Sequence, residues 1–121
     1  MIRTGQQYRD SLKDGRQVWM NGERIKDVAI HPAFKPIVDI RARIYDMAHE
    51  KATASAMTCV DENTGETNCV GYQLPRTQEH WQAKRKVVDL VMKEIGGVVI
   101  RVGDETIGEM WSLYDGRVVL S

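Results

Sequence analysis

Apolar positions recur at helical spacing in two long stretches of the chain. The first stretch runs from Pro36, which suits the first turn of a helix, to about Glu50. Its apolar stripe contains Ile37, Ile40, Ile44, Met47 and Ala48, and its polar face contains Asp39, Arg43, Asp46 and Glu50. Because such a stripe is typical of a helix that covers a core, the pattern predicts core packing for it.

The second stretch, from Pro75 to Gly97, predicts the longest helix. Thr77 is expected to cap its beginning, and Gly96-Gly97 to end it. Its apolar face is expected to contain Trp81, Val88, Val91 and Ile95, widened by Val87 and Met92. The basic run Lys84-Arg85-Lys86 is interleaved with that face, so at least one of its members should lie near the interior or a partner. A solvated face is the usual interpretation of such a run, and anion recognition is the alternative.

Shorter signals predict one more helix and two hairpins. Thr4 is a plausible N-cap for a short helix that Gly15 can end. Asn21-Gly22 fills both positive-φ positions of a type I′ turn, which places Val18 opposite Ile25 and Trp19 opposite Arg24.

The second predicted hairpin, from Met57 to Tyr72, is expected to turn through a three-residue loop, Asn63-Thr64-Gly65. That register places Cys59 directly opposite Cys69, where a disulfide is reachable but strained. Two reduced, packed thiols are the expectation in a cytoplasmic protein. The stretch 98–106 allows two interpretations. It is either a strand, or the segment before a final helix that Asp104 or Thr106 would cap. Together, the predicted elements give an α+β fold class that is mainly helical.

The composition excludes some classes of function but does not indicate an activity. The 121 residues suit a single domain, 1–121, and Lys+Arg and Asp+Glu both number 17. A balanced charge argues against a nucleic-acid or anionic-membrane binder, and no apolar run approaches the ~18 residues of a membrane span. We therefore expect a cytoplasmic protein. The chain ends directly after an apolar run, which we interpret as a domain cut from a longer protein. Ile107, Met110, Trp111 and Leu113 are then expected near an apolar patch that other domains or a second copy would cover.

No catalytic constellation is complete in the sequence. It has no Gly-rich phosphate loop, no nucleophile elbow and no two-histidine metal spacing. The histidines stand apart, at 31, 49 and 80, and the two cysteines lack the spacing of a zinc site. The residues alone indicate a soluble α+β domain of unknown activity with no metal.

Four blocks of sequence, however, resemble the opening of one enzyme family. They are Thr4-Gly5-x-x-Tyr8-x-x-Ser11-Leu12, Asp14-x-Arg16-x-Val18, Gly22-Glu23-Arg24-Ile25-Lys26-Asp27-Val28 and His31-Pro32-Ala33-Phe34. Tyr45-Asp46 and the basic start of the second long helix also match. In these blocks and their spacing the chain resembles the 4-hydroxyphenylacetate 3-hydroxylase family of reduced-flavin-dependent aromatic monooxygenases.

The resemblance implies a fold, a cofactor and partners. Members are several times longer and resemble acyl-CoA dehydrogenases in fold, and this chain would be their mainly helical N-terminal domain. It implies reduced FAD supplied by a separate flavin reductase, O2 and a phenolic substrate as reactants, and a homo-oligomer. The domain would contribute a wall of the substrate pocket and part of the subunit interface, and the basic run could contact a flavin phosphate. Catalytic residues and residues that bind the cofactor are not identified.

The family's substrate-side motif, Arg-x-Pro-Asp-Tyr, follows the second long helix. Here that position reads Arg101-Val102-Gly103-Asp104-Glu105, so Arg101 and Asp104 match while Glu105 replaces the tyrosine. The resemblance thus implies substrate binding by Arg101, Asp104 and Glu105, and Arg101 could hold a phenolate or carboxylate. The Glu105 difference puts 4-hydroxyphenylacetate itself in doubt. The alternative for Arg101 is a solvated strand residue.

Two other interpretations stay open. The iron–sulfur branch of the family, 4-hydroxybutyryl-CoA dehydratase, is disfavoured because no cysteine follows Cys69. The alternative to an enzyme is a non-catalytic binding or oligomerisation module, in which Trp81, Trp111 and Tyr114 would make a protein contact.

Overall fold

A computed structural model of the chain describes residues 2–97, 113, 114, 116 and 117. Its elements in chain order are α1 (Gly5–Ser11), β1 (Val18–Met20), β2 (Glu23–Ile25), α2 (Lys35–Met47), α3 (Ala54–Met57), β3 (Thr58–Val60), β4 (Thr67–Cys69), the short 3-10 helix η1 (Val70–Tyr72) and α4 (Gln78–Glu94). The predicted class is confirmed, with a short first helix, two long helices and two hairpins. Helix α3 and η1 were not predicted.

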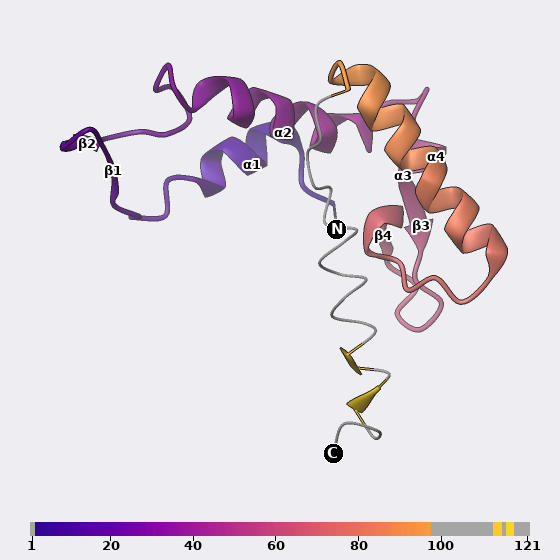
Figure 1. Cartoon of the computed structure of the whole chain (residues 1–121). Coiled ribbons are helices and arrows are strands. Elements are labelled where there is room, and N and C mark those ends of the chain that lie inside the picture. The colour runs from indigo at the N-terminus through magenta and orange to yellow at the C-terminus, as the bar shows by residue number, and fades with distance from the viewer. Residues whose placement is uncertain (1, 98–112, 115, 118–121) are drawn as a thin grey trace.

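Helix α2 connects the two parts of the molecule (Figure 1). Helix α1 lies along it, and the hairpin β1–β2 extends beyond them at the far end. Around the other end of α2 lie α3, the hairpin β3–β4 and α4. The main core cluster is at this second end and contains Ile44, Met47, Ala48, Met57, Val70, Val87 and Val91.

Helix α1 begins at Thr4, as expected, with a complete capping box. The Thr4 hydroxyl accepts from the backbone N–H of Gln7, whose side chain in turn accepts from the backbone N–H of Thr4. The backbone N–H of Gly5 then donates to the Asp46 carboxylate of α2, at 2.7 Å. The start of α1 is therefore fixed twice, once by its own cap and once by α2.

Helix α2 is buried on two sides rather than along one stripe. Val38 and Ala42 are buried as well as Ile44 and Met47, and the Ala42 carbonyl lies close to Gly5 of α1. Ile37 was predicted to be in the core, but 45% of its surface is exposed. The prediction was wrong there because α4 packs on the C-terminal half of α2, where Ile44 and Met47 lie. The helix also ends at Met47, before the predicted Glu50.

Helix α4 has the predicted cap but a different buried face. The Thr77 hydroxyl accepts from the backbone N–H of His80, at 3.3 Å. The buried positions are Lys84, Val87 and Val91. Trp81 was expected on this face, but it is 61% exposed, since the first turn of α4 extends past the core cluster. The position nearest the interior in that part of the helix belongs to Lys84.

The first hairpin has the predicted turn and register. Asn21 and Gly22 have φ values of 52° and 83°, as a type I′ turn requires. Val18 pairs with Ile25 and Trp19 with Arg24.

The register of the second hairpin differs from the prediction by one residue. Cys69 pairs with Thr58, and Cys59 pairs with Asn68, so the two cysteines are not opposite each other. The cause is Asp61, whose carboxylate accepts from the backbone N–H groups of Asn63 and Thr64 at 2.8 and 3.0 Å. This Asx turn starts the loop one residue earlier and makes it four residues long, with Gly65 still at a positive φ of 69°.

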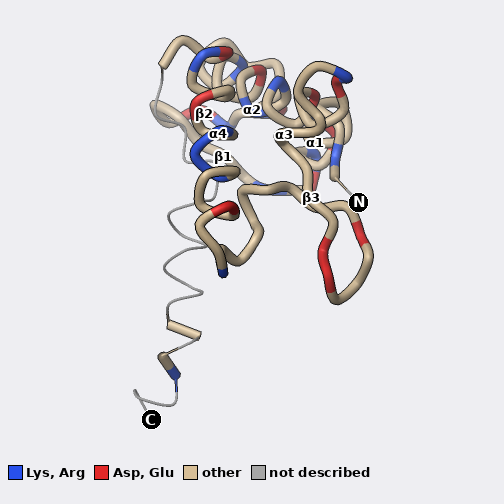
Figure 2. The backbone as a smooth tube through the Cα atoms, turned by 90° about the vertical axis from the view of Figure 1, so that its right-hand side faces the viewer, with Lys and Arg blue, Asp and Glu red and all other residues tan. Residues whose placement is uncertain are grey.

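Charged positions of both signs are distributed over the elements (Figure 2). Several form pairs, such as Arg9 of α1 with Asp39 of α2 at 2.7 Å. No helix in the described part of the chain has the length and apolar character to cross a membrane.

The close contact at Gly5 predicts that a methyl group there destabilises the fold. A Cβ at Gly5 would lie 2.6 Å from the Ala42 carbonyl oxygen and closer still to the Asp46 carboxylate. We expect Gly5→Ala to lower the free energy of unfolding by about 1–3 kcal/mol, the usual cost of overpacking. Urea denaturation measures the change. Gln6→Ala, at an exposed neighbour, should stay within about 0.5 kcal/mol of the wild type. An equally stable Gly5→Ala variant would show that α1 does not pack on α2 in this way.

The offset register predicts that Cys59 and Cys69 stay reduced. Neighbouring positions on paired strands point to opposite faces of the ribbon, so a disulfide would need a register change. Burial raises the pKa of both thiols above the ordinary value of 9.0. We expect two free thiols after denaturation without reductant, and slower alkylation at neutral pH than for an unstructured cysteine. An intrachain disulfide found by mass spectrometry after mild oxidation would contradict the register.

Candidate functional site

A small cavity lies between α2, α3, the hairpin β3–β4, η1 and α4. We call it the α2–α4 cavity; its volume is about 60 Å³. Its floor is made by three buried apolar side chains, Ile44, Met57 and Val87, which also belong to the core cluster. The rest of its lining consists of Arg41, Tyr45, Cys69, Gly71 and Tyr72. The cavity thus has an apolar interior and a polar rim.

Two groups of this rim, the Tyr72 phenol and the Cys69 thiol, are held in their neutral forms. Tyr72 is 49% exposed, and burial of the remainder raises the pKa of its phenol, with smaller contributions from Tyr45 and Cys69. Burial likewise raises the pKa of the Cys69 thiol. Since neither group ionises near neutral pH, neither can act there as a nucleophile or general base. The arrangement can surround a small ligand but does not supply acid–base chemistry.

A ring contact connects this rim to α1. The rings of Tyr45 and of Tyr8, on α1, lie 5.2 Å apart between their centres, with their planes tilted by 31°. This distance is typical of a favourable aromatic pair. The next residue, Asp46, is the one that accepts the Gly5 hydrogen bond. Tyr45 and Asp46 are thus part of the contact of α2 with α1.

Lys84 confirms that one member of the basic run lies in the interior. It is only 6% exposed, and its ammonium donates to the Gly71 carbonyl at 2.7 Å. The neighbouring Arg85 and Lys86 are exposed. Lys84 therefore anchors η1, and with it one side of the cavity, to α4.

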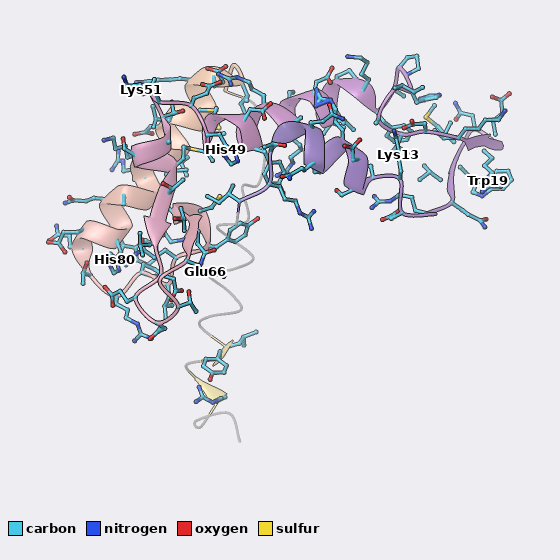
Figure 3. All side chains as sticks on the ribbon, turned by 180° about the vertical axis from the view of Figure 1, so that it is seen from behind. Lys13, Trp19, His49, Lys51, Glu66 and His80 are labelled. Atoms are coloured by element: carbon cyan, nitrogen blue, oxygen red, sulfur yellow. The ribbon has the colours of Figure 1, made fainter. Side chains whose placement is uncertain are left out.

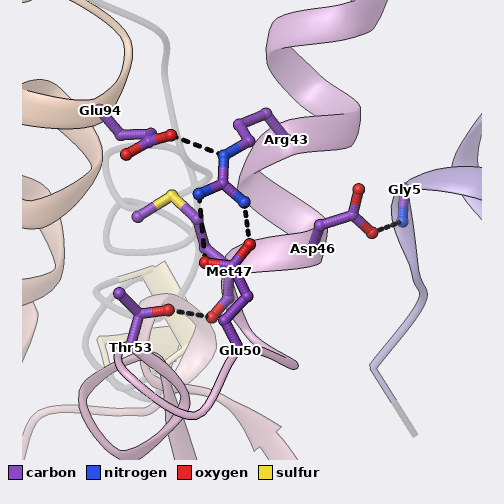
Figure 4. Close-up of polar contacts among 7 residues, drawn as sticks. All are labelled: Gly5, Arg43, Asp46, Met47, Glu50, Thr53 and Glu94. Atoms are coloured by element: carbon purple, nitrogen blue, oxygen red, sulfur yellow. Dashed lines mark hydrogen bonds and ion pairs between the residues drawn. The ribbon is translucent and has the colours of Figure 1, made fainter.

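The polar face of α2 makes contacts of its own instead of facing only water (Figure 4). Arg43 donates through Nε to Glu94 of α4 at 2.6 Å and forms a two-pronged pair with Glu50. These bonds raise the pKa of the Arg43 guanidinium, and Arg43 lowers that of Glu50. This ion cluster holds α2, α4 and the turn after α2 together.

The histidines have ordinary structural partners. His31 Nδ1 accepts from the backbone N–H of Ala33, and His80 Nδ1 accepts from that of Arg76, both at 3.2 Å. His49 Nε2 lies 3.1 Å from the Arg3 carbonyl. His49 and His80 lie on separate elements, as Figure 3 shows. Within residues 2–97 and the few described near the C-terminus, no group of acidic, histidine or cysteine side chains could hold a metal.

The predicted substrate residues Arg101, Asp104 and Glu105 lie outside the described residues, as do Ile107, Met110 and Trp111. Leu113 is described and is 62% exposed. The cavity was missed by sequence reasoning, because its lining comes from five elements. The one signal that pointed to it was Lys84, a cation at an interior position of an amphipathic helix.

A family model described as "4-hydroxyphenylacetate 3-hydroxylase N terminal" matches residues 4–121. The chain belongs to this family. The chain is 38% identical to 2,4,6-trichlorophenol monooxygenase of Cupriavidus pinatubonensis over 97 residues. This aligned region covers 80% of the chain and 19% of that protein. It is 35% identical over 94 residues to the FADH(2)-dependent monooxygenase TftD of Burkholderia cepacia, over 78% of the chain and 18% of that protein. The chain thus spans about a fifth of the length of these curated relatives.

Solved structures show the same fold. The oxygenase component (HpaB) of 4-hydroxyphenylacetate 3-monooxygenase, complexed with FAD, superposes with a TM-score of 0.69 and 28% identity, over 76% of this chain and 19% of that one. A 4-hydroxybutyryl-CoA dehydratase from N. maritimus gives the same TM-score at 22% identity, over 78% of this chain and 19% of that one. This second likeness concerns the fold alone. The family match over residues 4–121 confirms the family resemblance that was predicted from the sequence.

The buried position of Lys84 predicts a structural effect of its removal. We expect Lys84→Ala to lower the free energy of unfolding by about 2–4 kcal/mol, because it leaves a void and takes the donor from the Gly71 carbonyl. The control Lys86→Ala, exposed on the same helix, should change it by no more than about 0.5 kcal/mol. Chemical denaturation of both variants measures the difference. Equal stabilities would instead favour a role for Lys84 in binding an anion.

Proposed function

We propose that the chain is the N-terminal domain of a two-component, FADH2-dependent monooxygenase that hydroxylates a phenolic substrate. The family match over residues 4–121 carries this proposal. The names of the relatives support it, since 2,4,6-trichlorophenol monooxygenase and TftD are named as monooxygenases and TftD as FADH(2)-dependent. The reductant would be FADH2 from a separate flavin reductase, and the other reactants O2 and a phenol.

The α2–α4 cavity does not fit a flavin. The α2–α4 cavity of about 60 Å³ is far smaller than the roughly 300–1,000 Å³ of cofactor clefts. Lys84, the interior cation of the basic run, donates to the Gly71 carbonyl, so we do not assign it to a flavin phosphate. FAD would therefore bind outside this cavity, and we propose that protein beyond this domain takes part, in keeping with the much greater length of the relatives. The domain's own contribution would be a wall of the substrate pocket and part of an oligomer interface.

Arg101, Asp104 and Glu105 are the proposed substrate residues. Their support is the position directly after the second long helix, where the family's substrate-side motif falls. An arginine there can hold a phenolate through a charge-assisted bond, or a carboxylate through two parallel ones. Glu105 in place of tyrosine favours a phenol other than 4-hydroxyphenylacetate. We further propose a cytoplasmic homo-oligomer in which residues 1–121 form one domain.

The activity is tested on the complete protein that carries these 121 residues. It is mixed with FADH2 and a panel of phenols, and isotopically labelled dioxygen is admitted. We expect products that carry one labelled oxygen atom beside the phenol oxygen, detected by mass spectrometry. Unmodified phenols throughout the panel, in the presence of folded protein, would remove the enzyme assignment.

The role of Arg101 is tested separately by Arg101→Met in the same assay. We expect KM for the phenol to rise about 10- to 100-fold, the equivalent of one lost charge-assisted interaction, and Arg101→Lys to recover part of it. The exposed Arg85 provides the control variant, Arg85→Met, which should leave KM unchanged. An unchanged KM in Arg101→Met would assign Arg101 to the solvated surface.

The runner-up is a non-catalytic assembly module. Exposed aromatic side chains favour it, because Trp81 and Tyr114 are 61% and 56% exposed and such residues dominate interface cores. Thermal melting of the complete protein that carries these 121 residues, with light scattering for its oligomeric state, distinguishes the two functions. A stable oligomer whose melting temperature responds to neither FAD nor phenols would favour the module.

A further inference from the structure

We propose that the α2–α4 cavity is a binding site for a small apolar gas molecule, and that its ligand is dioxygen. The choice of dioxygen rests on the proposed monooxygenase function, which consumes it. The site itself is argued from the size and chemistry of the cavity.

The size of the cavity selects a very small ligand. Its volume of about 60 Å³ is the share of roughly two water molecules in the liquid. An engineered apolar cavity that accepts benzene has about 150 Å³. A diatomic molecule therefore fits in the α2–α4 cavity as it stands, whereas a phenol ring does not.

The chemistry of the floor disfavours water. Ile44, Met57 and Val87 offer no hydrogen-bond donor and only the weak thioether acceptor of Met57. A buried water needs two to four polar partners, and the floor offers at most this one weak acceptor. Dioxygen is apolar and needs no such partner, so it occupies the space without losing hydrogen bonds.

The rim gives this space an opening to the surface. Tyr72 is half exposed, and it lies at the edge of the cavity together with Arg41 and Tyr45. A ligand can thus enter past the Tyr72 side chain without unfolding of the core. The neutral thiol of Cys69, also in the lining, is a poor nucleophile at neutral pH and would not consume the gas.

The core contains matched residues for a direct test. Met57 and Met47 are both buried in the core cluster, at 3% and 1% exposure, but only Met57 lines the cavity. Val87 and Val91 of α4, at 4% and 0%, form a second pair in which only Val87 lines it. The methyl groups of each pair therefore differ mainly in access to the cavity.

The experiment is methyl NMR of the 121-residue chain under several bar of dioxygen, with no flavin present. Dioxygen is paramagnetic and speeds the relaxation of nearby nuclei. We expect relaxation enhancements at Met57 and Val87 at least about twofold larger than at Met47 and Val91, because an apolar cavity concentrates the gas. Xenon is the second probe and should shift the same two methyl signals. Equal enhancements within both pairs, or water found in the cavity by its magnetisation transfer to Met57, would overturn the proposal.

Variants give an independent result. Val87→Ile adds one methylene group toward the cavity and should abolish the xenon shift at Met57, whereas Ile44→Val enlarges the cavity and should increase it. Leu90→Ile, on the same helix but outside the lining, should leave the shift unchanged. If Val87→Ile does not fold, the xenon shift at Met57 in Ile44→Val is the deciding result. An undiminished xenon shift at Met57 in a folded Val87→Ile chain would contradict the proposed site. The gas-binding experiment does not depend on enzyme activity. If no gas binds, the hydroxylation assay can still succeed. If gas binds but no phenol is hydroxylated, the gas site exists without a role in an oxygenase.

Discussion

The burial of α2 on two sides is the constraint on which the rest of the structure depends. On one side of its C-terminal half, α1 comes so close that only a glycine fits at position 5, with the Ala42 carbonyl against it and the Asp46 carboxylate on its N–H group. On the other side of the same half, Ile44 and Met47 pack with Val87 and Val91 of α4. A helix that was buried only along the predicted stripe would hold one of these partners and release the other. The hairpin β1–β2 is joined to the molecule through this arrangement, and the cavity has α2 as one of its walls.

Features that depend on neighbouring residues could be predicted from the sequence. Thr4 and Thr77 cap their helices and Asn21-Gly22 makes its turn because each acts on backbone groups within a few positions. The second hairpin was predicted only in part from its sequence. The position of Gly65 in the loop was predicted correctly. The Asp61 carboxylate, however, accepts hydrogen bonds from loop N–H groups and lengthens the loop, which shifts the register by one residue and separates Cys59 from Cys69. A local polar side chain thus changed a long-range pairing.

Which face of a helix is buried could be predicted only in part. Spacing places residues on a common face, but it does not say how far along that face a partner extends. Ile37 and Trp81 satisfy the periodicity and are exposed, because each lies on a turn that passes beyond the core cluster. Lys84 is a charged residue at an apolar position of the helix and is buried, since the Gly71 carbonyl accepts a hydrogen bond from its ammonium. The cavity depends on several such encounters at once, so no single segment could have predicted it. Arg101, Asp104 and Glu105 came from the family resemblance alone.

The electrostatics of the described residues fit a domain that supports chemistry carried out elsewhere. Burial keeps the two thiols and the Tyr72 phenol protonated, and the Glu50 carboxylate is committed to Arg43. The three histidines have backbone partners, and none of them lines the α2–α4 cavity. Under the proposed function the cavity needs no reactive group of its own, because the cofactor would supply the reactive centre. The contribution that we propose for this domain is then geometric, since a wall with a small apolar space can guide small uncharged reactants. The paired charges on α2 serve the same end, because they fix the helix that forms this wall without placing a titrating group inside it.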